Sequence, residues 1–247
     1  MPYYDSYTMS FRERLVYTSA ASLVIFAVAF IFYRSFIFSA LLTPLALLYP
    51  RMKTRDIISR RKKELNIQFK DMLYSLSSSI SAGKTVEAAF KEVLKDLSVL
   101  YPESSAFILV EVRRIISRLE MNETLEAALS DFAARANLED ADNFVNVFNI
   151  CKSSGGNIAE VIKNTSAIIN DRIEVAQEVD TLLAERKFEQ KVLNVVPILM
   201  ILLLSASAPE YMNPVFNTGT GRFTMSVSIA LLTAAWFISA KVSDIKL

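Results

Sequence analysis

Residues 151–189 read CKSSGGNIAEVIKNTSAIINDRIEVAQEVDTLLAERKFE, and they predict where one helix ends and a second begins. We expect Gly155 and Gly156 to end the first helix, because glycine readily adopts the left-handed backbone that closes a helix C-terminus. Asn157 is then expected to cap the second helix, with Glu160 three residues later in the position that a capping box requires. This stretch therefore predicts two consecutive helices separated by a tight glycine turn.

The second of these helices is predicted to be long. No proline or glycine occurs between Asn157 and Val196, and apolar or small residues recur three to four positions apart. At a rise of 1.5 Å per residue, such a helix reaches roughly 50 Å. Because its polar first part leads directly into an uncharged run, we expect it to act as a mechanical strut between cytosol and membrane.

The composition predicts a polar domain joined to membrane spans. Of the 247 residues, 52% are hydrophobic and 21% are charged, which is too apolar for a soluble domain and too charged for a wholly embedded one. The formal net charge of +1 gives no general attraction to nucleic acid. With no histidine and one cysteine, the chain lacks Ser-His-Asp and Cys-His catalysis, imidazole zinc sites and an internal disulfide. We interpret Cys151 as a small buried hydrophobe rather than a reactive thiol.

Four uncharged runs are predicted to lie in the membrane: 15–33, 36–50, 192–208 and 223–240. A signal peptide is the alternative for the first run, but no clear small-residue cleavage site follows it. The second run is short, so a tilted or re-entrant segment is an open alternative to a full span in this 15–50 hairpin. Pro197 is expected to kink the third run. Residues 209–222 are expected to form a turn-rich loop between the last two.

The basic residues predict the orientation of these spans. Residues 51–63 form a basic segment with seven cations: Arg51, Lys53, Arg55, Arg60, Arg61, Lys62 and Lys63. Such a cluster beside a span marks the cytosolic face and attracts anionic lipid headgroups, and a partner-docking role is a further hypothesis. Seven more basic residues lie on the same predicted side: Arg12, Arg14, Arg186, Lys187, Lys191, Lys241 and Lys246. Only Arg34 and Arg222 lie on the other side, so residues 1–14, 64–191 and 241–247 are expected in the cytosol.

Residues 64–191 are predicted to form a cytosolic helical bundle. An apolar stripe marks its first helix: Leu65, Phe69, Met72, Leu73, Leu76 and Ile80. Shorter helices follow at 85–97, 102–119, 124–136 and 139–152, with brief connections that favour antiparallel packing. An internal repeat lies within them, TVEAAF at 85–90 and TLEAAL at 124–129. Thr85 and Thr124 are expected to cap their helices, and the alanine pairs to admit a close neighbouring helix.

Motifs for catalysis are weak. The GKT at 83–85 resembles part of a nucleotide-binding loop, but Ser78 stands where that motif needs its first glycine, and a helix rather than a strand is predicted before it. The acids Glu139, Asp140 and Asp142 lie where a helix begins, which complements the helix dipole. The uncharged runs contain no Asp, Glu, Lys or Arg, which counts against a transporter. We therefore predict no enzyme activity, no metal and no cofactor.

Three stretches together resemble a known family. SAGKTVEAAFKEV at 81–93, SSGGNIAEVI at 153–162 and PEYMNPVFNTGTGR at 209–222 are similar to the platform proteins of Tad (Flp) pilus machines, the TadB- and TadC-like members of the type II secretion F-domain family. The resemblance implies an all-α integral membrane protein whose six-helix F domain starts near Asn66. A single such bundle points to the Tad branch, whose platform proteins work in pairs. Lys84 and Asn122 depart from the family pattern.

The function implied by this resemblance is that of a non-catalytic platform in the inner, cytoplasmic membrane for pilus assembly or protein secretion. Its expected partners are a hexameric assembly ATPase, a paired homologous platform protein, pilin subunits and membrane lipid, and the protein is expected to be an oligomer that binds no nucleic acid. A membrane-bound signalling receptor or scaffold with a coiled-coil helix is the alternative.

Overall fold

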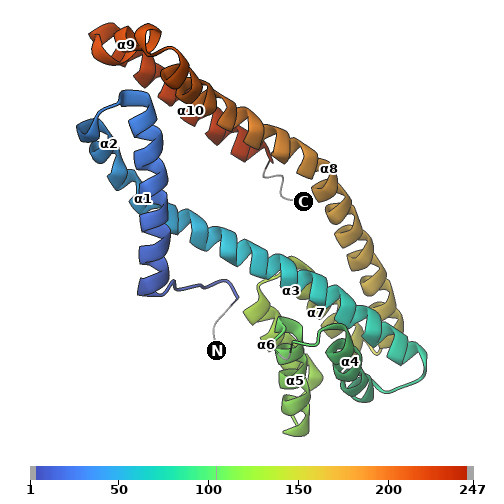
Figure 1. Cartoon of the computed structure of the whole chain (residues 1–247). Coiled ribbons are helices and arrows are strands. Elements are labelled where there is room, and N and C mark those ends of the chain that lie inside the picture. Colours follow the sequence, from blue (N-terminus) through green and yellow to red (C-terminus); the bar gives the residue numbers. More distant parts are fainter. Residues whose placement is uncertain (1–3, 104, 244–247) are drawn as a thin grey trace. The chain divides into compact units, whose positions relative to one another are not determined.

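The computed structural model describes residues 4–103 and 105–243, and within them every regular element is a helix (Figure 1). In chain order these are α1 (Phe11–Tyr33), α2 (Phe36–Leu42), η1 (Thr43–Leu48), α3 (Tyr49–Ser81), α4 (Val86–Leu100), α5 (Phe107–Glu120), α6 (Leu125–Ala136), α7 (Glu139–Ser153), α8 (Ile158–Ser207), α9 (Pro209–Asn217) and α10 (Gly219–Ser243). The all-helical prediction is confirmed. The chain divides into two units, Met1–Thr8 with Thr54–Val175, and Met9–Lys53 with Ala176–Leu247.

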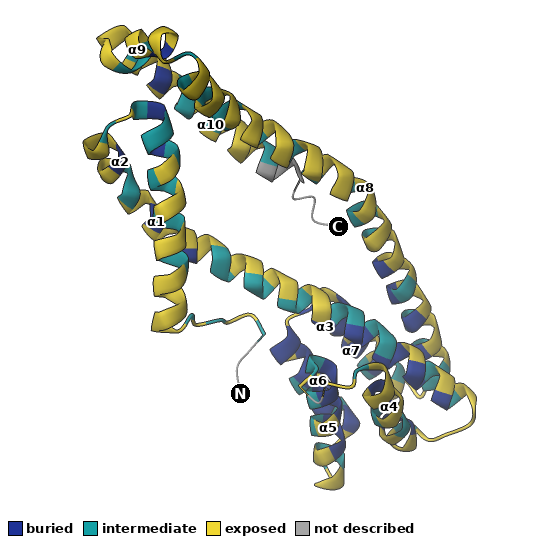
Figure 2. Ribbon diagram, viewed as in Figure 1, coloured by how far each residue is buried: buried dark blue, intermediate teal, exposed yellow. Residues whose placement is uncertain are grey.

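The first unit is a helical bundle with one hydrophobic core. Buried residues come from α3, α4, α5, α6, α7 and the start of α8, and Figure 2 shows them as dark blue positions on these helices. The ring of Phe69 lies at the centre of this core, with ring centroids 5.5 Å from Phe132 and 5.9 Å from Phe144. Five of the six predicted stripe residues of α3 are fully buried, and Ile80 is partly buried. The predicted stripe is therefore the face of α3 that packs into the bundle.

Two helix starts in the bundle differ from the prediction. α3 begins at Tyr49, so the basic segment is helical and continuous with the first bundle helix, because no glycine interrupts residues 51–81. The helix predicted at 102–119 begins only at Phe107. Instead, the phenol of Tyr101 donates to Asp71 Oδ2 at 2.5 Å, and Gln68 Oε1 accepts from the backbone N–H of Ile108 at 3.0 Å. Side chains of α3 thus hold this connection in an irregular conformation.

The second unit contains the helices suited to a membrane. Among the residues that the structure describes, three helices are long and apolar enough to cross a bilayer: Phe11–Tyr33, Ile158–Ser207, which enters this unit at Ala176, and Gly219–Ser239. Large apolar side chains such as Leu23, Leu203 and Leu231 are more than 60% exposed on them, which is costly in water and favourable in lipid. A small core of Phe32, Met212 and Met225 joins α1, α9 and α10. Pro197 lies inside α8, which continues past it to Ser207.

The run at 36–50 does not form one membrane-crossing helix, so the prediction of four spans is not confirmed. It is divided into α2 and η1, and Pro44 lies at the start of η1. Proline has no N–H to donate to the preceding turn, which explains why a regular α-helix ends here. The structure therefore shows two short helical segments in place of one uninterrupted helix.

The expected turn-rich loop at 209–222 is wrong, since most of it is helical. Pro209 occupies the first turn of α9, where proline is favourable because its missing N–H has no helical partner in any case. Thr218 is extended and separates α9 from α10. A Cβ atom at Gly221 would lie 2.6 Å from the Cα of Val215, so this glycine serves close packing of α10 on α9.

Candidate functional site

Three helix caps predicted from the sequence have the expected geometry. Thr85 Oγ1 accepts from the backbone N–H of Ala88, and Thr124 Oγ1 accepts from that of Ala127, both at 3.3 Å. Asn157 Oδ1 accepts from the backbone N–H of Glu160, also at 3.3 Å. The internal repeat thus provides the same threonine N-cap at the starts of α4 and α6. In each alanine pair only the second residue, Ala89 or Ala128, is buried against a neighbouring helix.

The glycine pair works differently from the prediction. Gly155 has the left-handed backbone, with φ of 68°, whereas Gly156 has no positive φ. Gly156 donates its N–H to the carbonyl of Cys151 at 2.9 Å, and a Cβ there would lie 2.8 Å from Cys151 Sγ. Gly155 therefore makes the turn, and Gly156 permits the close approach of the chain to the end of α7. Cys151 itself is only partly buried.

The GKT segment is a helix connection. Gly83 has φ of 85° directly after α3, which places a helix where a nucleotide-binding loop would need a strand. Lys84 Nζ lies 3.2 Å from Glu92 Oε2, and the hydrogen bond from Lys84 is the main reason that the pKa of Glu92 is lowered. Asn122 has φ of 62°, a conformation that asparagine tolerates better than most residues.

A buried ion pair, which the sequence analysis missed, joins α5 and α6. Glu111 is 3% exposed and Arg135 is 6% exposed. The guanidinium of Arg135 donates to the carboxylates of both Glu111 and Asp131. Arg118 also lies 2.7 Å from Asp131. A signal was available, because Glu111 interrupts the apolar face of its helix at a position where only core residues are expected.

The N-terminal segment packs on the bundle over this pair. The hydroxyl of Tyr4 donates to Glu111 Oε1 at 2.9 Å, and its ring meets Phe107 edge-on with centroids 5.5 Å apart. Burial, followed by the charge of Glu111, raises the pKa of the Tyr4 phenol well above its usual range. Asp5 lies 3.3 Å from Lys62 Nζ. Residues 4–8 therefore belong to the bundle unit and form a strap across it, which the sequence analysis did not anticipate.

The basic segment is only partly engaged in these contacts. The guanidinium carbon of Arg61 lies 4.4 Å from the centroid of the Tyr7 ring, and Lys62 pairs with Asp5. Side chains at Arg51, Arg55 and Arg60 are exposed. Within the basic segment, Arg61 and Lys62 thus contact the N-terminal strap, whereas Arg51, Arg55 and Arg60 face solvent.

A second group of buried polar contacts, in addition to the Glu111–Arg135 ion pair, connects α3, α7 and α8. Asp140 is 7% exposed and accepts from Asn66 Nδ2 at 2.9 Å and from Arg172 at 2.8 Å. Glu139 also pairs with Arg172, at 3.2 Å, and the charge of Asp140 is the main cause of the raised pKa of Arg172. Both acids lie in the first turn of α7, as expected, but Asp140 is in addition a buried link between helices.

These groups connect the helices of the bundle. Each strongly buried acid faces a cation, which is the arrangement that makes buried charge tolerable. Within residues 4–103 and 105–243, no three of the His, Cys, Asp and Glu side chains are grouped as a metal site requires. The arrangement resists deformation, because the ion pairs of Arg135 and Arg172 connect different helices in addition to the hydrophobic core, and each cap stabilises the start of its own helix.

Comparison with known proteins found one matching family. The model of the family described as "Type II secretion system (T2SS), protein F" matches residues 72–206, which is more than half of the chain. The matched region begins in α3 and ends in α8, so it includes the caps, the Glu111–Arg135 ion pair, Asp140 with Arg172, and the glycine pair, whereas Asn66 lies before it. No curated protein and no solved structure matched the chain.

Proposed function

Because this chain belongs to the type II secretion system protein F family, we propose that it is a non-catalytic platform of the inner membrane that supports assembly of a Tad-type pilus or a related secretion filament. A platform of this kind transmits force and carries out no reaction. The bundle is the F domain, with six helices, and it lies in the cytosol with both termini. Residues 209–222 face the opposite side.

The main support for this proposal is that α8 contains both residues of the bundle core and an uncharged run. Its first part buries Ile162, Ile169 and Ile173 in the bundle core, and its last part is the uncharged run that includes Val192 to Ser207. The same hydrogen-bonded backbone therefore belongs to both a packed polar domain and a membrane helix. A movement imposed on the bundle is passed along this helix to the membrane segment, as a force-transmitting platform requires.

The proposed motor is a hexameric assembly ATPase that contacts the bundle. The exposed cations Arg51, Arg55 and Arg60 of the basic segment are candidates for that contact as well as for anionic lipid. Pilin subunits contact the membrane helices, and a second, homologous platform protein completes the assembly. Support for the Tad branch comes from the resemblance of residues 209–222 to the outer loop of Tad platform proteins.

Affinity purification of the tagged full-length chain from detergent-solubilised membranes tests the proposal. We expect a hexameric ATPase to co-purify with the wild-type protein, and we expect the Arg51→Gln/Arg55→Gln/Arg60→Gln variant to recover less of it. A triple variant in exposed basic positions away from this segment, Lys91→Gln/Lys95→Gln/Lys163→Gln, is the matched control for lost charge. Recovery of a signalling enzyme in place of an ATPase would favour the receptor alternative and contradict the platform.

A further inference from the structure

One pocket of the second unit is lined by the corner after α1, by the end of α8 and by α9, and the start of α10 lies beside the end of α1. α1 ends at Tyr33, α8 ends at Ser207 and α10 begins at Gly219. The hydroxyls of Tyr33 and Ser226 are 2.9 Å apart, which fixes the end of α1 beside the start of α10. Because all three helices are suited to crossing a membrane, an end that they share lies at the level of the lipid headgroups.

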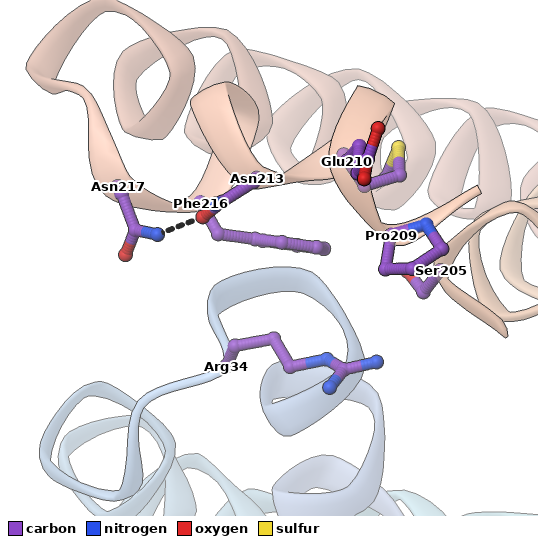
Figure 3. A pocket seen from close by; sticks show the side chains of 8 residues that line it. Arg34, Ser205, Pro209, Glu210, Asn213, Phe216 and Asn217 are labelled. Atoms are coloured by element: carbon purple, nitrogen blue, oxygen red, sulfur yellow. Dashed lines mark hydrogen bonds between the residues drawn. The ribbon is translucent and has the colours of Figure 1, made fainter.

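The pocket at this end has a volume of about 350 Å³ and is bordered by α9 on one side and by the corner after α1 on the other (Figure 3). Arg34, at that corner, has φ of 48°, and its guanidinium carbon lies 5.8 Å from the centroid of the Phe216 ring. Glu210, Asn213 and Asn217 of α9 also line the pocket. A cation, an acid and two amides therefore line the same space, and the amides are hydrogen-bonded to each other, with Asn217 Nδ2 donating to Asn213 Oδ1 (Figure 3).

The charged groups of this pocket are not paired with each other. Among the residues that the structure describes, neither Arg34 nor Glu210 has an ion-pair partner. The hydroxyl of Ser205, at the pocket wall, is buried and has no hydrogen-bond partner in the described part of the chain. A pocket with one free cation, one free acid and an unsatisfied hydroxyl suits a ligand that carries both charges.

An apolar slot lies deeper along the same helices. It has a volume of about 210 Å³, and its lining includes Val28, Phe32, Ile198, Ile229, Leu232 and Trp236. Val28 precedes Arg34 by six residues of α1, and Ile198 precedes Ser205 by seven residues of α8. At 1.5 Å per residue these separations are about 9 to 10 Å, so the slot lies below the polar pocket toward the hydrocarbon. A polar pocket above an apolar slot fits an amphiphile.

We propose that this pocket binds a phospholipid whose headgroup carries a primary ammonium beside its phosphate. Arg34 forms a bidentate contact with the phosphate, and Glu210 accepts hydrogen bonds from the ammonium. A quaternary ammonium cannot donate to Glu210, and a phosphoglycerol headgroup has no cation to offer it. An acyl chain lies in the slot. This lipid site is separate from the attraction of the basic segment for anionic lipid and goes beyond the platform function.

Native mass spectrometry of the full-length chain tests the lipid site. The protein is released from detergent micelles that contain equal amounts of three lipids with identical acyl chains and with ethanolamine, choline or glycerol headgroups. We expect the ethanolamine lipid to be retained about tenfold better than the other two, because only its ammonium donates hydrogen bonds to the charged Glu210. Arg34→Gln lowers retention of all three lipids, whereas Glu210→Gln lowers retention of the ethanolamine lipid to about that of the other two.

Arg12→Gln is the matched control for lost charge. Arg12 is exposed in the first turn of α1, at the opposite end of that helix from Arg34, and it does not line the pocket, so the variant keeps both retention and preference. Circular dichroism of each variant separates lost binding from lost folding. Equal retention of the three lipids, or an unchanged preference in Glu210→Gln, overturns the proposal. Displacement of the lipid by an equal concentration of O-phosphoethanolamine also overturns it, by assigning the pocket to a free zwitterion.

Discussion

Replacing Glu111 with alanine should loosen the bundle, because the substitution removes one of the two acids that face the buried guanidinium of Arg135. It also removes the acceptor of the Tyr4 hydroxyl. Breaking a buried ion pair by removing one partner costs about 3–5 kcal/mol. The second acid, Asp131, is retained and is 32% exposed, so we expect the lower end of that range, about 3 kcal/mol.

Hydrogen exchange of the full-length protein in detergent micelles measures this loss. A free-energy change of 1.36 kcal/mol corresponds to a factor of ten, so 3 kcal/mol predicts about a hundredfold faster exchange for the most protected amides of α5 and α6. Glu120→Ala is the control, because Glu120 pairs with Lys91 at 3.4 Å with both side chains more than 60% exposed. Such a surface pair is worth about 0–1 kcal/mol.

A double variant shows whether the loss comes from an unpaired charge. Glu111→Met combined with Arg135→Met removes both charges and keeps apolar volume, so its exchange should be much closer to that of the wild type than the exchange of Glu111→Ala. If Glu111→Ala exchanges as slowly as Glu120→Ala, the ion pair does not stabilise the bundle. If the double variant is as fast as Glu111→Ala, the loss comes from packing and not from charge.

Three further predictions concern the turns and the strap. Gly155→Val should lower the thermal midpoint of the bundle more than Gly156→Ala. Valine at position 155 would be a branched residue at positive φ, whereas alanine at position 156 must displace only the sulfur of Cys151. Equal midpoints would contradict this. Thr124→Ala should cost about 1 kcal/mol of unfolding free energy through the lost cap, and a serine variant should restore it. The pKa of the Tyr4 phenol is raised above its ordinary value of 10.0, so its contribution to stability is complete below pH 10 and is lost as the pH rises further. An ultraviolet difference titration of the wild type against Tyr4→Phe should show that Tyr4 ionises above pH 10. Ionisation near pH 10 would argue against burial of the phenol.

Local sequence signals predicted much of the bundle because they act over one helical turn. Thr85, Thr124 and Asn157 each accept from the backbone N–H three residues later, and such contacts depend only on neighbouring residues. The stripe on α3 was predictable for the same reason, since helical periodicity places its residues on one face. These features required no knowledge of how the helices pack.

The sequence could not predict contacts between residues distant in the chain. The hydrogen bond from Tyr4 to Glu111 joins residues 107 positions apart in the sequence, and nothing near Tyr4 indicates its partner. Proline and glycine led to the wrong prediction of a loop at 209–222, because Pro209 begins a helix and Gly221 permits close packing of two helices. The pair at 155–156 shows the same limit, because composition cannot tell a turn glycine from one that permits close approach.

The platform function is tested most directly by deleting the gene for this protein and measuring filaments or exported substrate at the cell surface. We expect surface filaments to disappear in the deleted strain while pilin accumulates in the membrane, and we expect the wild-type chain to restore the filaments. The Asp180→Pro variant breaks α8 between its core residues and its uncharged run, so it should not restore the filaments although it still inserts in the membrane. Normal filaments in the deleted strain, or full restoration by the Asp180→Pro chain, would contradict the claim that this helix transmits force.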